Sequence, residues 1–97
     1  MTLAELAARA LAAYDELASL GEDVEDEWTY VNDLAANWRA RLEAVVDARG
    51  SEPVAAEVVA GVERAIEEIA LIRDPHRAID WLSTFPQVVL LALGERP

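Results

Sequence analysis

Carboxylates are densest directly before Trp28, where five of them occupy the six positions 22–27. The five are Glu22, Asp23, Glu25, Asp26 and Glu27. Such a run could bind Ca²⁺ or steer a basic partner. Counted from Asp23, however, the sixth and twelfth positions of an EF-hand loop are Trp28 and Leu34 instead of Gly and Glu. The alternative is a helix start, where carboxylates offset the free N–H groups of the first turn.

Other metal sites are supported only in part. A di-iron bundle needs Glu three residues before His, but Arg73 stands three residues before His76, the one histidine. Glu22 and Glu25 form one E-x-x-E pair, of the kind that two-metal hydrolases in helical bundles use, and a matching second pair is absent. A carboxylate-metal hydrolase remains the alternative function, with four candidate ligands. They are Glu22, Glu25, Glu63 and Glu67.

Nucleophilic catalysis has equally weak support. Ser83 follows His76 by seven residues, but Ser83 stands at a predicted helix end, and His76 is expected at the surface near acidic residues. The sequence contains no phosphate-binding glycine loop and no G-x-S-x-G motif. A polar row along one predicted helix is expected to be a half-exposed flank, and Trp28, Trp38 and Trp81 are expected to pack. The row is Tyr30, Asp33, Asn37 and Arg41. We therefore predict no catalytic residue, metal or cofactor, and favour a protein that is not an enzyme.

Composition limits the partners. The 97 residues predict one domain, 1–97, and 19 Asp and Glu against 8 Arg give a formal net charge of −11. This charge argues against direct binding of nucleic acid or of an anionic membrane. There is no Cys, no signal-peptide-like apolar start, and no apolar run longer than the six residues 88–93. These features suggest a cytoplasmic protein.

Apolar periodicity predicts an all-α fold, an antiparallel bundle of three long helices followed by two short ones. The long helices are expected over 3–20, 24–48 and 52–73, and the short ones over 75–83 and 85–93. A short strand over 87–93 is the alternative to the last helix, because periodicity cannot distinguish the two in so short a run. Thr2 and Glu5 predict a capping box at the first start, and Gly21 a left-handed residue at its end. Later N-caps are predicted at Asp23, Ser51, Asp74 and Thr84, with Pro53 and Pro75 in first turns and Gly50 and Gly94 at helix ends. Gly61 lies inside the third helix, where a close helix crossing would explain it.

The last predicted helix is apolar in every direction, so it must be covered all round. We predict that a second subunit covers it by two-fold symmetry, with Val88, Leu91 and Leu93 as the contact residues. The alternative is that this helix closes the open end of its own bundle.

Together these patterns favour a non-enzymatic protein–protein interaction module, a small regulator or assembly accessory protein that acts as a homodimer. Its partner is expected to have a basic surface or an amphipathic helix, toward which the carboxylates at 22–27 steer. An acidic DNA mimic that inhibits a nucleic-acid-binding protein is a further alternative to the hydrolase.

Overall fold

The computed structural model describes residues 1–21 and 27–96, and the regular structure of these residues is helical. The α-helices are α1 (Leu3–Ser19), α2 (Glu27–Arg49), α3 (Ala56–Glu67) and α4 (Pro75–Ala92), with a 3-10 turn, η1 (Glu68–Leu71), after α3. Within this described part there is no strand, only one isolated bridge between Thr2 and Pro53. The all-α prediction is confirmed. The prediction of three long and two short helices is wrong.

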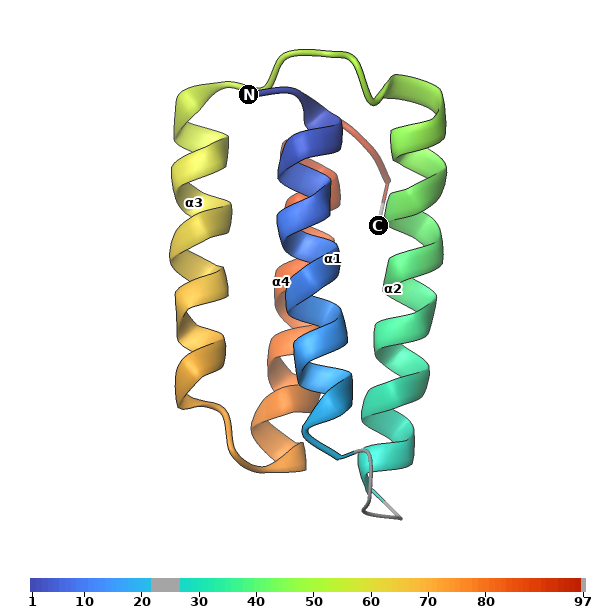
Figure 1. Cartoon of the computed structure of the whole chain (residues 1–97), viewed down its shortest axis with the longest axis vertical. Coiled ribbons are helices and arrows are strands. Elements are labelled where there is room, and N and C mark those ends of the chain that lie inside the picture. Colours follow the sequence, from blue (N-terminus) through green and yellow to red (C-terminus); the bar gives the residue numbers. More distant parts are fainter. Residues whose placement is uncertain (22–26, 97) are drawn as a thin grey trace.

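The four helices stand side by side along the 39 Å long axis of the molecule, and consecutive helices run in opposite directions (Figure 1). In this view α1 lies in front of α4, with α2 on one side of this pair and α3 on the other. Helix α2 packs closely on both α1 and α4, whereas α3 makes far less contact with either. The molecule is therefore a tight three-helix unit with α3 along one side.

The core lies between α1, α2 and α4, where the apolar stripes predicted for the first two helices meet. Leu6 and Leu17 of α1, Leu42 of α2 and Leu82 of α4 are all buried. Tyr14 is also buried, its ring 5.9 Å from that of Trp81 in an edge-to-face contact. This burial raises the pKa of the Tyr14 phenol.

The start of α1 is fixed by its own cap and by a distant loop. Thr2 and Glu5 form the predicted capping box, and hydrogen bonds from Thr2 lower the pKa of Glu5. The next two N–H groups donate to the loop after α2, from Leu3 to the Glu52 carbonyl at 2.8 Å and from Ala4 to the Gly50 carbonyl at 2.9 Å. The free N–H groups of this helix end are thus largely satisfied.

These contacts correct the predicted start of the third helix. Pro53 pairs with Thr2, and the Val54 N–H donates to the Met1 carbonyl at 3.0 Å, so the chain is extended there. Helix α3 begins at Ala56 with Ala55 as an N-cap that makes no side-chain bond, and neither Ser51 nor Pro53 has its predicted role. Pairing with the N-terminus replaces the first turn of the expected helix.

The two predicted C-terminal helices form one helix, α4. Asp74 caps it as predicted, accepting from the Arg77 N–H at 3.0 Å, and Pro75 is its first residue. Pro86 was expected in the first turn of a new helix, but α4 continues through it and buries its ring. Thr84 is therefore not an N-cap, and the Gln87 side chain donates to the Ser83 carbonyl at 2.9 Å instead of forming a capping box. Burial of Phe85, Val89 and Leu90 on either side of Pro86 keeps the helix together.

Gly21 is required because there is no room for a side chain, not because its backbone is left-handed. In the described residues the glycine with a positive φ is Gly94, at 81°. A Cβ at Gly21 would lie 2.4 Å from the ring of Trp28. The predicted left-handed end of the first helix is therefore wrong, whereas the predicted helix end at Gly94 is confirmed. Leu20, expected on the core stripe, is exposed.

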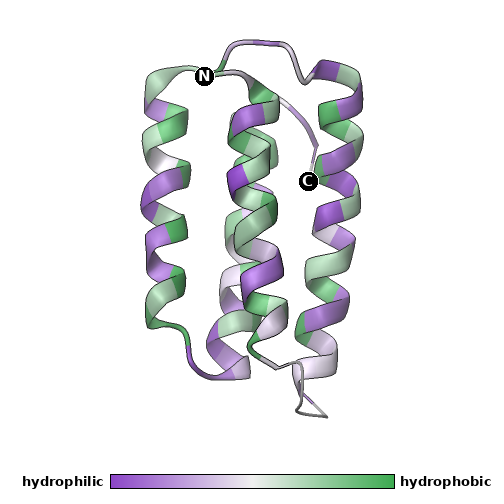
Figure 2. Cartoon of the chain, viewed as in Figure 1, coloured by the Kyte–Doolittle hydropathy of each residue, from purple (hydrophilic) through white to green (hydrophobic). Residues whose placement is uncertain are grey.

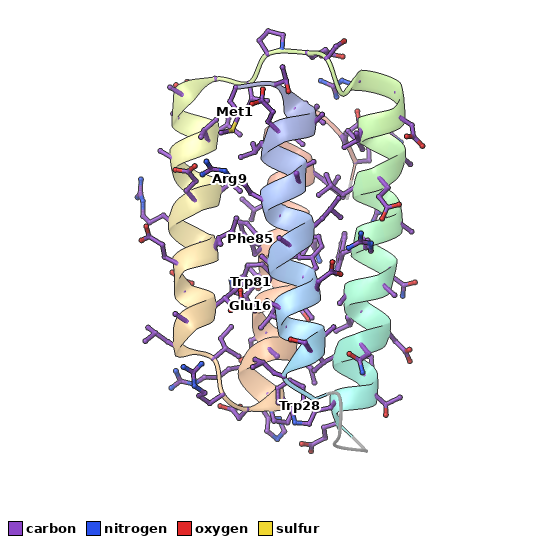
Figure 3. All side chains as sticks on the ribbon, viewed as in Figure 1. Met1, Arg9, Glu16, Trp28, Trp81 and Phe85 are labelled. Carbon is purple, nitrogen blue, oxygen red and sulfur yellow. The ribbon has the colours of Figure 1, made fainter. Side chains whose placement is uncertain are left out.

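Helix α3 is held to the bundle by few interactions. Its hydrophobic side faces the other helices and its hydrophilic side faces outward (Figure 2). Arg9 of α1 extends toward α3 and pairs with Glu63 (Figure 3). The Trp81 indole N–H donates to the Ala65 carbonyl at 3.2 Å, and Val62 is the one fully buried side chain of α3.

We expect Gly61→Ala to raise the free energy of unfolding of the single chain by about 0.5–1 kcal/mol, because glycine is unfavourable inside a helix. Gly61 lies in the middle of α3, and a Cβ there would meet no atom within 4 Å. Urea denaturation of dilute protein followed by circular dichroism measures the change. The matched control, Ala60→Gly on an exposed neighbouring position, should shift stability by a similar amount in the opposite direction. A loss of stability in Gly61→Ala would contradict the open space at this position.

Candidate functional site

The main cavity of the molecule is an open groove of about 890 Å³ between α3 and α4. Its inner wall is formed by buried apolar side chains from both helices and from the segment after η1. They are Val62, Ile72, Trp81, Phe85 and Val89. Trp81 and Phe85 lie behind the space between the α1 and α3 ribbons, their rings 4.3 Å apart (Figure 3). The groove is therefore a continuation of the apolar core to the surface.

The sequence of α3 explains why the groove stays open. The α3 residues that line it include Gly61, which has no side chain, and Ala65, which has only a methyl group. At the end of α3 the helix tightens into η1, which places Leu71 at the groove edge with 73% of the residue exposed. Helix α3 thus presents small residues at its centre and one large apolar residue at its end.

The α4 edge of the groove is also apolar. Val88 lines the groove and is 53% exposed, and Leu91, one turn later on the same side of α4, is 58% exposed. Isolated exposed apolar residues are ordinary, but these adjoin an apolar groove. Groove and edges form one continuous hydrophobic surface, of the kind that marks interaction sites.

Charges surround the groove. Glu57 lines the end near the start of α3, while Glu68, Arg77 and Asp80 line the opposite end. Three carboxylates against one guanidinium leave the lining net negative. Arg77 Nε lies 3.8 Å from the Asp74 carboxylate, an exposed pair that neutralises little of this charge.

The described lining of the groove includes no His, Cys or Ser side chain. Among residues 1–21 and 27–96, no three His, Cys, Asp or Glu side chains lie close enough to share a metal ion. Glu63, one proposed hydrolase ligand, pairs with Arg9. Glu67 lines a smaller hollow of about 370 Å³ beside that pair. Glu22 and Glu25, the other two, lie outside the described residues.

The predicted binding residues have different outcomes. Glu22, Asp23, Glu25 and Asp26 lie outside the described residues, and Glu27 begins α2 with its carboxylate 3.5 Å from His76 Nε2. Val88 is exposed in the groove lining, and Leu91 is exposed one turn later on α4. Leu93 is buried at 8% exposure within its own chain, which corrects its assignment as a contact residue. The final helix is therefore covered on part of its circumference by its own bundle.

The remaining candidates are structural. His76 is an exposed side chain beside Glu27, and no hydrogen bond joins it to Ser83. Trp28 is buried, and the guanidinium of Arg41 lies 5.0 Å above the ring of Trp38. Tyr30 is exposed on α2. The polar row of α2 thus faces solvent, away from the groove.

Sequence reasoning missed the α3 half of the groove. Gly61 carried the available signal, since glycine inside a helix needs a reason. The close crossing by a neighbouring helix that was expected there is not found in the described part of the chain. No feature of the sequence indicated that Leu71 would line the groove. A regular helix continuing to residue 73 would direct its side chain differently from the way η1 does. The groove could be found only from the placement of α3 beside α4.

Comparison of the chain with protein-family models, curated proteins and solved structures gave no match. None of the helices in residues 1–21 and 27–96 combines the length and the apolar character needed to cross a bilayer. Arguments about function therefore rest on the groove and its surroundings.

Proposed function

We propose that this chain is a non-enzymatic protein–protein interaction module, a small regulator or assembly accessory protein that receives an apolar helical face of another protein chain. The apolar groove between α3 and α4 carries this proposal. Helix-in-groove recognition requires a hydrophobic channel between two helices, anchored by side chains at successive turns of the occupant. The buried wall from Val62 to Val89 supports such anchoring along the length of α3 and α4.

The charges around the groove define a second property of the partner. Glu57, Glu68 and Asp80 favour an occupant with Lys or Arg beside its apolar face, and the net charge of −11 speeds encounter with basic surfaces. A second copy of the chain is the other source of an apolar helical face. The hydrolase and the DNA mimic have no observation in their favour among the described residues.

We expect an amphipathic helical peptide, with leucines on one face and arginines on its flanks, to shift the NMR amide signals of α3 and α4. A peptide of the same composition in scrambled order is the ligand control. Val88→Glu should weaken binding about tenfold or more, because it places a charge at the apolar edge, where losing one anchor costs about 1.5 kcal/mol or more.

Tyr30→Glu is the matched control variant, since Tyr30 is as exposed as Val88 but lies on α2, and it adds the same charge. Tyr30→Glu should bind the peptide like the unchanged protein. Equal weakening by both variants would show only an electrostatic effect, and an absence of shifts on α3 and α4 would contradict the proposed function.

A further inference from the structure

We propose that the occupant of the α3–α4 groove is a second copy of this chain, packed by a two-fold axis that places Leu71 of each copy in the partner's groove beside Gly61. This inference rests on the proposed function, because it names the chain that supplies the helical face. It extends the homodimer expected from Val88 and Leu91 to a specific surface on α3 and α4.

An isologous interface must carry both a projection and the recess that receives it on the same face, because the same surface meets itself. The α3–α4 face has both. Leu71 projects at one end of the groove, with 73% of the residue exposed. Gly61, in the middle of α3, and Ala92, at the end of α4, line the groove farther along, and a Cβ at Gly61 would meet no atom within 4 Å.

Gly61 supplies an independent reason for close packing. Inside α3 glycine is less favourable than alanine, because its backbone loses more conformational freedom on folding. Nothing in residues 1–21 and 27–96 requires this cost, since a Cβ would meet no atom within 4 Å there. Glycine facing a groove lets the backbone or a large side chain of an occupant approach α3 closely. The Leu71 side chain of the partner at this position explains why residue 61 is glycine.

The two-fold axis must run across the helices rather than along them to bring these ends together. Because α3 and α4 are antiparallel, Glu57 and Ala92 lie at one end of the groove and Leu71 and Arg77 at the other, with Gly61 in between. The same axis brings Arg77, the one cation of the lining, toward the partner's Glu57.

Charge distinguishes this occupant from a basic peptide. Glu68 and Asp80 leave the lining net negative, and each copy carries −11, so salt must strengthen association of two copies by screening their repulsion. A peptide with basic flanks must instead bind more weakly as salt rises. The sign of the salt dependence therefore identifies the source of the helical face.

Sedimentation of the full chain over a wide concentration range, at about 50 and about 500 mM NaCl, tests the assembly. We expect a monomer–dimer equilibrium whose dissociation constant falls several-fold at the higher salt. Leu71→Asp should raise that constant about 100-fold, since it places a charge in an apolar recess. The exposed Leu71 contributes little to its own chain, so circular dichroism should show unchanged folding. Tyr30→Asp is the matched control and should leave dimerisation unchanged.

Engineered cysteines test the geometry, because the chain has no Cys of its own. Leu71→Cys mixed with Gly61→Cys should form a disulfide-linked pair under mild oxidation, whereas Leu71→Cys mixed with Ala60→Cys, on the outer side of α3, should not. Equal cross-linking in both mixtures, or a dimer that tolerates Leu71→Asp, would overturn the proposed arrangement.

The same measurements separate the two proposals. A chain that stays monomeric at every concentration and salt, yet binds the basic amphipathic peptide in the groove, overturns the second copy and leaves the interaction module standing. A monomer that binds no peptide overturns both.

Discussion

Trp81→Ala is expected to lower the free energy of unfolding by about 3–5 kcal/mol, the largest loss from a single substitution in α4. Trp81 is buried where three helices meet. Its ring contacts Tyr14 of α1 and Phe85 of α4, and its indole N–H donates to the Ala65 carbonyl of α3. Removal leaves a cavity that opens into the groove and releases the one hydrogen bond that links α4 to α3 in the described residues.

The measurement is urea denaturation followed by far-UV circular dichroism. Trp81→Phe is the control, since it keeps an aromatic ring but lacks the N–H, and it should cost less than the alanine variant. In Trp81→Phe, the missing hydrogen bond accounts for about 1 kcal/mol of the decrease in the free energy of unfolding. If both variants lost equally little stability, Trp81 would not be the residue that fixes α3 on the bundle.

Gly50→Ala is expected to lower the free energy of unfolding by about 1–3 kcal/mol, because it overpacks a junction of backbone atoms. A Cβ at Gly50 would lie 2.6 Å from the Val46 carbonyl oxygen and 3.4 Å from the Ala4 Cβ. The Gly50 carbonyl also accepts from the Ala4 N–H, so a shift of this loop frees an N–H at the start of α1. The same methyl group should thus stabilise the chain at position 61 and destabilise it at position 50.

Thermal unfolding of Gly50→Ala and Gly61→Ala, measured side by side on dilute protein, checks this contrast. A similar shift of the melting temperature in both variants, in one direction, would mean that helix propensity alone determines the response. Opposite shifts would establish that position 50 is limited by space and position 61 by propensity.

Arg49 explains why the loop at Gly50 has little freedom to move. Its guanidinium donates to Glu52 at 2.9 and 3.1 Å, to Glu95 at 2.7 Å and to the Leu93 carbonyl at 2.7 Å. The hydrogen bonds to Glu52 and Glu95 raise the pKa of Arg49. The hydrogen bond from Arg49 lowers the pKa of Glu52. One side chain thus joins the end of α2, the following loop and the end of α4.

This junction also bears on the groove. It holds α4 at its C-terminal end, where Val88 and Leu91 are exposed, while α3 is attached by the Arg9–Glu63 pair and by Trp81. The α4 edge of the groove is consequently the better supported one. An occupant therefore meets a firmly held α4 and an α3 with fewer attachments.

The sequence by itself determined the features that depend on near neighbours. The Thr2–Glu5 box, the Asp74 cap before Pro75 and the helix end at Gly94 were predictable because each is decided within about one helical turn. Apolar spacing also predicted the core positions of α1 and α2, such as Leu17 and Leu42, since a helical period places them on one face.

The tertiary structure alone decided the features that depend on distant partners. Pairing of Thr2 with Pro53 removed the expected first turn of α3, and burial of Pro86 kept α4 whole despite a local signal to break. Leu93 is a core residue because the bundle covers it. Leu71 is exposed because η1 turns its side chain outward. The groove belongs to this second group: it exists because small residues on α3 meet α4 across a gap, and no local pattern encodes the distance between two helices.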